Sequence, residues 1–471
     1  MREKPNPDEV KAAGKAASVD ARESGRGGRP VRYEGCSPDL GKGEIVDIAP
    51  KLADHAVVTD TGAFAQFLGA YKDQDTFTQE EIDAIYKDTI AHGVNDHHPI
   101  DAFFASKGLR PEKCSTRMAV EYKDAILALI QKHRIQKVIT HYDSDLDAVA
   151  SSYLVKSLID NGELPRIAED LATVTNKADY GRFDVADPDV FVNTLPGLVA
   201  ALKDEFGQQC RREIQEKGFS PALLAKYENV RNSAIFDLLN ALNDEKMHDV
   251  EFDIGGDVSR VEERLSEELR RAIIEGKKRL KESYETFLKD FTEAEKFRAA
   301  VAGKDGNDMM ADIIVGESTD PLLFINLAYT RTSPETIVAA YAGQDRKAGD
   351  AYDIGIQPDQ ANVFDLRNVC LALNKAERKK RDALYGKPAD KRSAEEQRLI
   401  DGWETQKAEG KLRDMFPGIQ DMVARGDVDE EDILNIDPTP LVAGGSLIPA
   451  SRSSILTEDE FRAVLREFAV S

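Results

Sequence analysis

Short apolar runs alternate with amphipathic helical segments between residues 46 and 200, and no other feature restricts the fold as strongly. The runs HAVVTD, TIAHGVND, QKVITHYD and LPRIAE are typical of buried strands. The segments MAVEYKDAILALIQKH and LDAVASSYLVKSLIDNG have the apolar spacing of helices. Strands that alternate with helices favour a mostly parallel sheet, in which ligands bind beyond the carboxyl ends of the strands. The sequence therefore predicts an α/β domain with its site at those strand ends.

The rest of the chain divides into three regions of different composition. Residues 1–45 are rich in Gly, Arg, Lys, Pro and Ser, which predicts a disordered or extended N-terminal arm. Residues 205–300 are highly charged and carry apolar residues at helical spacing, which predicts a solvated helical connector or insertion. Strand-like runs return in residues 301–471, for which we expect a C-terminal α+β domain. The parallel-sheet domain is expected to span residues 46–204.

The composition of this 471-residue chain restricts which partners and which cellular compartment we expect. No apolar run approaches the roughly 18 residues that cross a bilayer, and the N-terminal MREKPNPDEVK lacks the apolar core of a secretory signal. The four cysteines are far apart, without a CxxC pair, which favours a reducing, cytoplasmic setting. A formal net charge of -23 argues against binding to long nucleic acid. We therefore expect neither a membrane nor long nucleic acid as a partner.

The stretch THYDSDLDAVASS joins a predicted strand to a predicted helix and is rich in metal-ligand side chains. Because residues two apart on an extended chain face the same side, His141, Asp145 and Asp147 can converge at this turn. An imidazole with two carboxylates suits Mn²⁺, Mg²⁺ or Fe²⁺. An EF-hand loop is excluded, because Ala148 and Leu154 occupy positions that require Gly and Glu. An acidic N-terminal helix cap is the other interpretation, although one Asp would be enough for that role.

Further candidate side chains follow the neighbouring predicted strands. The segment HGVNDHHPIDAFF contains Asp96, His97 and His98 at the end of one of these strands. Because the chain has only 7 histidines, two adjacent ones beside an Asp are a concentrated signal. A hydrogen-bonded histidine in a turn would explain one of them but not the pair. Other charged residues in comparable positions are Asp60 in HAVVTDTGAF, and Asp179 and Arg182 in TNKADYGRFD.

Together these segments resemble the motifs of the DHH phosphoesterase superfamily, which includes single-strand exonucleases, enzymes that degrade oligonucleotides and dinucleotides, exopolyphosphatases and family II inorganic pyrophosphatases. HYDSDLDAVAS is similar to the first motif, VVTDTGAF to the second, NDHHP to the third and ADYGRF to the fourth. CSTRMAVEYKDAIL is similar to the Ser-Thr helix that follows the third motif. The resemblance covers residues 46–190. In the family the HxxxDxD motif comes first, whereas here it follows the DHH motif, so we expect a permuted sheet with the strand at 136–141 in a central position.

The resemblance implies a DHH-type catalytic domain that holds two divalent metal ions, of the Mn²⁺ type with Mg²⁺ or Co²⁺ as options. The implied metal ligands are His141, Asp145, Asp147, Asp60, His97 and Asp179, with Asp60 shared between the two ions. The implied chemistry is hydrolysis of phosphodiester or phosphoanhydride bonds by water that two metals activate. The same resemblance makes His98 and Asp96 catalytic, with His98 at the scissile phosphate or the leaving oxygen.

The C-terminal domain is expected to bind the substrate. Where the family carries a Gly-rich loop, this chain has AGGSLIPASRSSIL, with Gly444, Gly445, Ser446 and Arg452 as substrate contacts and Arg452 approaching the cleavage site. A plain surface turn is the alternative for this segment, and Arg182 is a further candidate contact. The expected substrate is a short oligonucleotide, a dinucleotide or polyphosphate, and a homodimer is compatible with this reading. Two other functions stay open: a catalytically silent nucleotide sensor with the DHH fold, and an acidic helical interaction protein.

Overall fold

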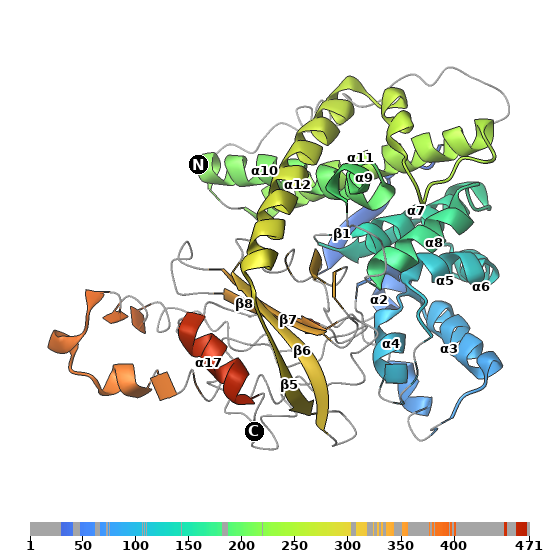
Figure 1. The fold of residues 1–471 in the computed structure, drawn as a ribbon. Helices are drawn as coiled ribbons and strands as arrows, with labels where there is room; N and C mark the ends of the chain where they lie inside the picture. Colours follow the sequence, from blue (N-terminus) through green and yellow to red (C-terminus); the bar gives the residue numbers. More distant parts are fainter. Residues whose placement is uncertain are drawn as a thin grey trace, which may run out of the picture. The chain divides into compact units, whose positions relative to one another are not determined.

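The computed structural model of the chain describes residues 30–40, 48–61, 66–71, 76–105, 111–142, 144–180, 187–218, 220–302, 308–317, 336–342, 351–356, 447–449 and 458–468, with single residues between these ranges and scattered residues within 324–332 and 376–401. All elements named below belong to one compact unit, Val31–Ser471 (Figure 1). The fold is mixed α/β, with one parallel sheet and one mixed sheet.

Four parallel strands form the first sheet, in the order β1-β4-β2-β3. Their bounds are β1 (Cys36–Leu40), β4 (Lys137–His141), β2 (Ala56–Thr59) and β3 (Val94–Asn95). Every residue of β2, and every residue of β4 after Lys137, is buried, as expected of apolar strands that are covered on both faces. The expected central position of the strand at 136–141 is confirmed, because β4 lies between β1 and β2.

The expectation of a disordered or extended arm up to residue 45 is wrong for residues 36–40. These residues form β1, which pairs in parallel with residues 138–141 of β4 at the edge of the sheet. The strand reads CSPDL, and its low hydrophobicity explains why no strand was expected there. Its pairing depends on backbone hydrogen bonds to β4, which a hydrophobic pattern does not reveal.

Seven helices accompany the first sheet in the described residues. They are α2 (Ile48–Ala53), α3 (Gln79–Ala91), α4 (His98–Ala105), α5 (Ser115–Glu121), α6 (Lys123–His133), α7 (Leu146–Asn161) and α8 (Ala168–Asp179). In α7, residues 146–158 are all buried. The small residues of this helix permit close contact with the strands, since Ser152 Oγ lies 3.0 Å from Thr59 Oγ1.

Two of the predicted strands differ from the structure. The segment LPRIAE is not a strand, because residues 164–167 lead directly into α8. In TIAHGVND, residues 89–91 complete α3 and only Val94–Asn95 form a strand. Both segments contain a few apolar residues at the end or start of an amphipathic helix, and short apolar runs of this kind do not distinguish a strand from a helix terminus.

The helical region begins earlier than the sequence indicated and shares a core with the first sheet. Its elements are α9 (Pro188–Phe191), α10 (Leu195–Lys217), α11 (Pro221–His248) and α12 (Glu267–Glu293). A single cluster of buried apolar side chains extends from Val31 to Ile273 and includes residues of α7, α10 and α11. The helices α10 and α12 cross closely at Gly276, where an added Cβ would lie 2.1 Å from the Ala201 carbonyl oxygen. This region is therefore packed against the sheet domain along its apolar faces.

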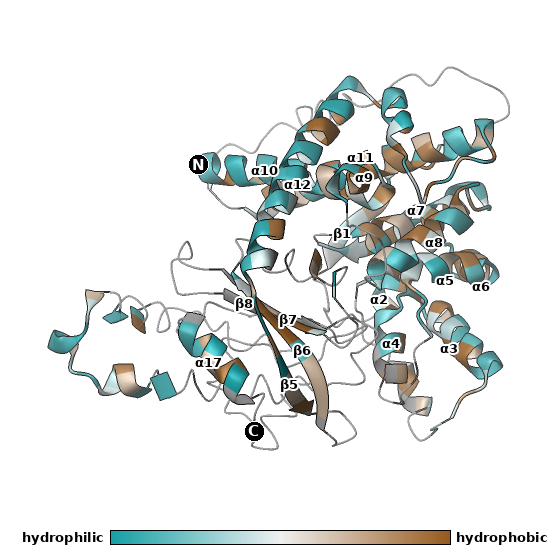
Figure 2. Ribbon diagram, in the orientation of Figure 1, coloured by the Kyte–Doolittle hydropathy of each residue, from teal (hydrophilic) through white to brown (hydrophobic). Residues whose placement is uncertain are grey.

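The second sheet has the order β5-β6-β7-β8-β9 and mixes parallel and antiparallel pairs. Its bounds are β5 (Glu295–Ala302), β6 (Asp308–Glu317), β7 (Thr336–Ala342), β8 (Ala351–Ile356) and β9 (Leu447–Pro449). Helix α17 (Glu458–Phe468) alternates hydrophilic and apolar residues (Figure 2) and buries Phe461 and Leu465. Of the strand-like runs expected within residues 301–471, MADIIVG, ETIVAAYAG and AYDIGIQ correspond to β6, β7 and β8, whereas a fourth run, NVFDLRN, lies outside the described residues.

None of the helices in the described ranges has an apolar stretch long enough to cross a membrane.

Candidate metal centre

The six expected metal ligands meet where three neighbouring strands end. They are Asp60 after β2, His97 after β3, His141 at the end of β4, Asp145 and Asp147 at the start of α7, and Asp179 at the end of α8. Asp60 has a left-handed backbone with φ of 45°, which is uncommon for a residue other than glycine. Strain of this kind occurs mostly at functional sites, where the surrounding structure holds it in place.

The ligand atoms form three groups, each of which could hold a metal ion because its atoms lie within 4.8 Å of one another. The groups are Asp60–His97–His98, Asp60–His141–Asp145 and His97–Asp147–Asp179. We call the second the His141 group and the third the Asp147 group. Asp60 and His97 each belong to two groups, so the three groups form one continuous cluster.

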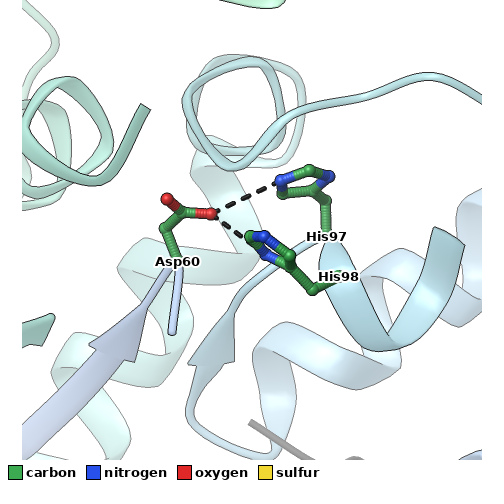
Figure 3. A group of neighbouring side chains, drawn as sticks. All are labelled: Asp60, His97 and His98. Atoms are coloured by element: carbon green, nitrogen blue, oxygen red, sulfur yellow. Dashed lines mark ion pairs between the residues drawn. The ribbon is translucent and has the colours of Figure 1, made fainter. Parts of the chain in front are cut away.

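Distances within the cluster show how closely its side chains approach one another. Figure 3 shows the rings of His97 and His98 facing the same oxygen of the Asp60 carboxylate, with His97 Nε2 at 3.4 Å and His98 Nδ1 at 3.2 Å from Asp60 Oδ1. His97 Nε2 also lies 3.7 Å from Asp147 Oδ2 and 3.5 Å from Asp179 Oδ2. The three distances from His97 Nε2 exceed an ordinary N–H···O hydrogen bond and leave space for an ion between the atoms.

The donor set fits a divalent cation. In the part of the chain that the structure describes, Asp60 Oδ2 and His97 Nε2 are buried and have no hydrogen-bond partner. An unsatisfied buried polar atom costs about 1–3 kcal/mol, and a bound cation would satisfy both atoms. Oxygen and imidazole donors without thiolate fit a divalent cation and do not form a soft-metal site.

The electrostatics of the cluster also favour a cation. Burial, together with the negative charges of Asp60 and Asp179, raises the pKa of Asp147 to about 8. Burial likewise raises the pKa of Asp179 to about 6, although the charge of His97 acts against it. Burial alone would raise the pKa of Asp60, but the charge of His98 and the close approach of the His141 and His97 rings hold this pKa well below its usual range. Crowded buried carboxylates resist ionisation, and a divalent cation would remove that resistance.

The Asp147 carboxylate is held by the first residues of α5. The Ser115 N–H donates to Asp147 Oδ2 at 2.7 Å, and the Thr116 N–H donates to Oδ1 at 2.8 Å. The Ser115 hydroxyl donates to Asp60 Oδ1 at 3.1 Å, and Asn95 Nδ2 donates to the Ser115 carbonyl at 3.0 Å. Because both Asp147 oxygens accept backbone hydrogen bonds, the orientation of this carboxylate is fixed before any ligand binds.

His97 is held from its other ring nitrogen by Asp101 and Tyr180. His97 Nδ1 lies 2.9 Å from Asp101 Oδ2, and the Tyr180 hydroxyl donates to the same oxygen at 2.5 Å. A carboxylate that binds one nitrogen of a histidine directs the other nitrogen toward a metal, which here is Nε2 in the centre of the cluster. Neither supporting residue was expected from the sequence. Asp101 lies four residues after His97, which is helical spacing, whereas Tyr180 offered no signal.

Asp96 takes no part in the three groups and instead positions its neighbours. Its Oδ2 accepts from the Thr61 N–H at 2.7 Å and from the Thr61 hydroxyl at 3.2 Å. Its Oδ1 accepts from the His98 N–H at 3.0 Å and lies 2.9 Å from His98 Nδ1. These contacts hold His98 and the turn after β2 in place, and the catalytic role expected of Asp96 stays a prediction.

The expected substrate contacts cannot be placed. Arg182, Gly444, Gly445, Ser446 and Arg452 lie outside the described residues. The Gly-rich loop and the approach of Arg452 therefore stay predictions.

Comparison with family models, with curated proteins and with solved structures finds no match to this chain. Membership of the DHH superfamily therefore rests on the motif residues alone and stays a prediction. The structure itself shows a parallel-sheet α/β domain in which buried Asp and His groups could hold a metal ion.

Proposed function

We propose that the chain is a divalent-metal-dependent phosphoesterase that hydrolyses phosphodiester or phosphoanhydride bonds of small substrates. The observation that carries this proposal is the cluster at the strand ends, in which the His141 group and the Asp147 group are joined through Asp60 and His97. Two such adjacent groups suit two ions of the Mn²⁺ type, with Mg²⁺ or Co²⁺ as substitutes. When bound, such a pair of ions supplies activation of an attacking water and neutralisation of charge on a phosphate.

The charges of the cluster suit an anionic substrate once two divalent ions are bound. The four carboxylates that belong to the His141 and Asp147 groups are Asp60, Asp145, Asp147 and Asp179. Their four negative charges balance two divalent cations. The balanced site would bind a phosphate, which the carboxylates alone would repel.

His98 is the residue that we assign to the substrate. Its Nδ1 is held by Asp96 at 2.9 Å and by Asp60 at 3.2 Å. The ring is therefore oriented with Nε2 directed away from these carboxylates and available to a substrate oxygen. A proton at Nε2 can pass to the leaving oxygen as its bond to phosphorus breaks, which is general acid catalysis.

The acidic character of the chain restricts the substrates that we propose. A formal net charge of -23 repels long polyanions, whereas a short oligonucleotide, a dinucleotide or a polyphosphate can be held locally by metals and a few cations. Arg182 and the segment Gly444–Ser446 with Arg452 remain our candidates for those local contacts.

A hydrolysis panel on the full chain tests the proposal. The substrates are diribonucleotides, cyclic dinucleotides, nucleoside phosphates, pyrophosphate and polyphosphate, each assayed with Mn²⁺ and with a chelator. We expect turnover of at least one substrate that stops when the chelator is added. Stoichiometric Mn²⁺ binding without turnover of any substrate would contradict the phosphoesterase and favour the nucleotide sensor instead.

Two Asp→Asn variants, one in the metal centre and one outside it, distinguish loss of metal binding from a general effect of the substitution. Asp147→Asn removes one negative ligand of the Asp147 group, and we expect it to lower both Mn²⁺ content and turnover. Asp187→Asn is the matched control, because Asp187 is an exposed helix cap that accepts from Asp189 N and Val190 N. Equal activity of the two variants would count against the assigned centre.

A further inference from the structure

The turn between β4 and α7, which carries two ligands of the His141 group, is bonded to the helical region. The Ser144 hydroxyl donates to the His141 carbonyl oxygen at 2.7 Å. Asn232 Nδ2, on α11, donates to Ser144 Oγ at 3.3 Å. Asn232, Ser144 and His141 are 1%, 0% and 1% exposed, so water does not compete for these bonds. Asn232, which is 88 residues from Ser144 in the sequence, is thus linked through the Ser144 hydroxyl to the backbone of the ligand residue His141.

The orientation of the Asn232 carboxamide is itself determined by neighbours. Arg231 Nε donates to Asn232 Oδ1 at 3.3 Å, which directs the amide nitrogen toward Ser144. The same nitrogen donates to the Tyr33 hydroxyl at 3.3 Å. Arg231 in turn forms a bidentate pair with Glu228, one turn earlier on α11.

The Glu228–Arg231 pair is unusual because it is buried, with side chains 8% and 5% exposed. Desolvation makes such a pair a weak source of stability, and well-packed apolar residues would do as well or better. Buried polar groups can instead be retained because they select one conformation of their neighbours. Here Glu228 holds Arg231, and Arg231 orients the Asn232 amide.

We propose that Asn232 is a positioning residue for metal binding, through which the helical region determines the metal affinity of the His141 group. This inference rests on the metal binding in the proposed function and extends it to a residue outside the motifs. Asn232 holds Ser144, Ser144 holds the His141 carbonyl, and the His141 ring and Asp145 are thereby kept at the distance that a shared ion requires. Loss of a residue that orients a metal ligand typically lowers metal affinity by about 10–100-fold.

The test is calorimetric titration of Mn²⁺ into the full chain after treatment with a chelator. We expect Asn232→Ala to weaken one of two Mn²⁺ sites by about tenfold, at the lower end of that range because the contact passes through Ser144. Asn232→Leu has a similar volume without hydrogen bonds and should have the same effect if the alanine variant folds poorly. Ser144→Ala should weaken the same site, and the double variant Asn232→Ala/Ser144→Ala should be no weaker than the weaker single variant.

Asn240→Ala is the matched control on the same helix. Asn240 also bonds to backbone, accepting from the Val31 N–H at 3.0 Å and donating to the Val31 carbonyl at 2.9 Å, and it accepts from the Tyr153 hydroxyl on α7 at 3.1 Å. None of these bonds reaches the described residues of the turn between β4 and α7. We expect this variant to lower the melting temperature and to keep both Mn²⁺ affinities. Asp145→Asn identifies the affected site, because it removes a ligand of the His141 group only.

Wild-type Mn²⁺ affinities in Asn232→Ala and Asn232→Leu would overturn the inference. Equal weakening by Asn232→Ala and Asn240→Ala would overturn it too, because the effect would then be one of general stability. If the wild-type chain binds Mn²⁺ but hydrolyses no substrate, the proposed function is contradicted. The Mn²⁺ affinities of the variants still test the role of Asn232 in that case. A wild-type chain that binds no Mn²⁺ removes both.

Discussion

The His141 group and the Asp147 group are built from similar side chains but are supported by different parts of the molecule. In the Asp147 group, Asp147 accepts from two backbone N–H groups of α5, and His97 is held by Asp101 within α4. These supports belong to the sheet domain itself. In the His141 group, Asp145 accepts from Ala148 N at 3.0 Å as the cap of its own helix, and the turn is held from α11.

The Asp147 group is therefore held by residues of the sheet domain, whereas the His141 group depends on the packing of the helical region against that domain. Backbone N–H groups at the start of a helix keep their positions as long as that helix is folded. A turn that is held by a side chain of a separate helical region keeps its position only while that region stays docked. We therefore expect the two groups to respond differently to substitutions in α4, α8 and the helical region.

The largest effect is expected from Asp60→Asn, because Asp60 is a ligand of the His141 group and its Oδ1 also lies 3.4 Å from His97 Nε2 of the Asp147 group. Loss of this ligand should lower turnover by about 10³-fold, or about 4 kcal/mol in transition-state stabilisation. Elemental analysis should show fewer bound metal ions per chain. Full metal content in this variant would break the assignment of Asp60 as a metal ligand.

Asp101→Asn should act on the Asp147 group alone. The substitution keeps the shape of the side chain but removes the charge that orients His97, which should weaken one Mn²⁺ site by about 10–100-fold. Asp83→Asn is a suitable control, because the Asp83 carboxylate bonds to Lys113 and Tyr122 and not to a ligand. If calorimetry finds both sites weakened equally in the Asp101 variant, the two groups are not supported independently.

Gly276→Ala tests how closely α10 and α12 pack against each other within the helical region. The added Cβ would lie 2.1 Å from the Ala201 carbonyl oxygen, so the helices must separate. We expect a loss of about 1–3 kcal/mol in the free energy of unfolding, measured by urea denaturation.

The matched control for that crossing is Gly207→Ala on α10. The nearest atom to an added Cβ there is 3.9 Å away, at the end of the Arg211 side chain. Alanine should then stabilise the helix by up to about 1 kcal/mol, because glycine is the poorer helix former. Loss of stability in both variants would show that glycine is needed in α10 for another reason.

The smallest effect is expected from Tyr180→Phe, which removes the hydroxyl that donates to Asp101 and keeps the ring. A single hydrogen bond contributes about 1 kcal/mol, so the Mn²⁺ affinity of the Asp147 group should fall by about fivefold at most. The His141 group should be unaffected in the same titration. An effect as large as that of Asp101→Asn would contradict this ranking and would make Tyr180 as important as Asp101 for the orientation of His97.

Part of the candidate site could be predicted because Asp60 and His141 lie at the ends of recognisable strands. Asp60 and His141 end runs of buried apolar residues, and parallel strands that lie side by side bring such ends together. The turn from β4 to α7 could be predicted because alternating aspartates followed by small residues are typical of a strand that leads into a buried helix. The supporting residues were not predictable in this way. Asn232 and Tyr180 look like ordinary helix and loop residues until the chain is folded.

The alternation of strands and helices in the first domain, and the side chains that could bind a metal there, follow from the amino-acid sequence alone. Those features are local, since apolar periodicity and the residue that follows a strand are set by neighbours in the chain. Folding of the whole chain was needed to show that residues 36–40 pair with β4, that Asp96 bonds to His98, and that α11 reaches the turn after β4. These contacts join residues that are distant in sequence or depend on the direction of a single hydrogen bond. They are selected by packing and by the need to satisfy buried polar groups, which no local pattern encodes.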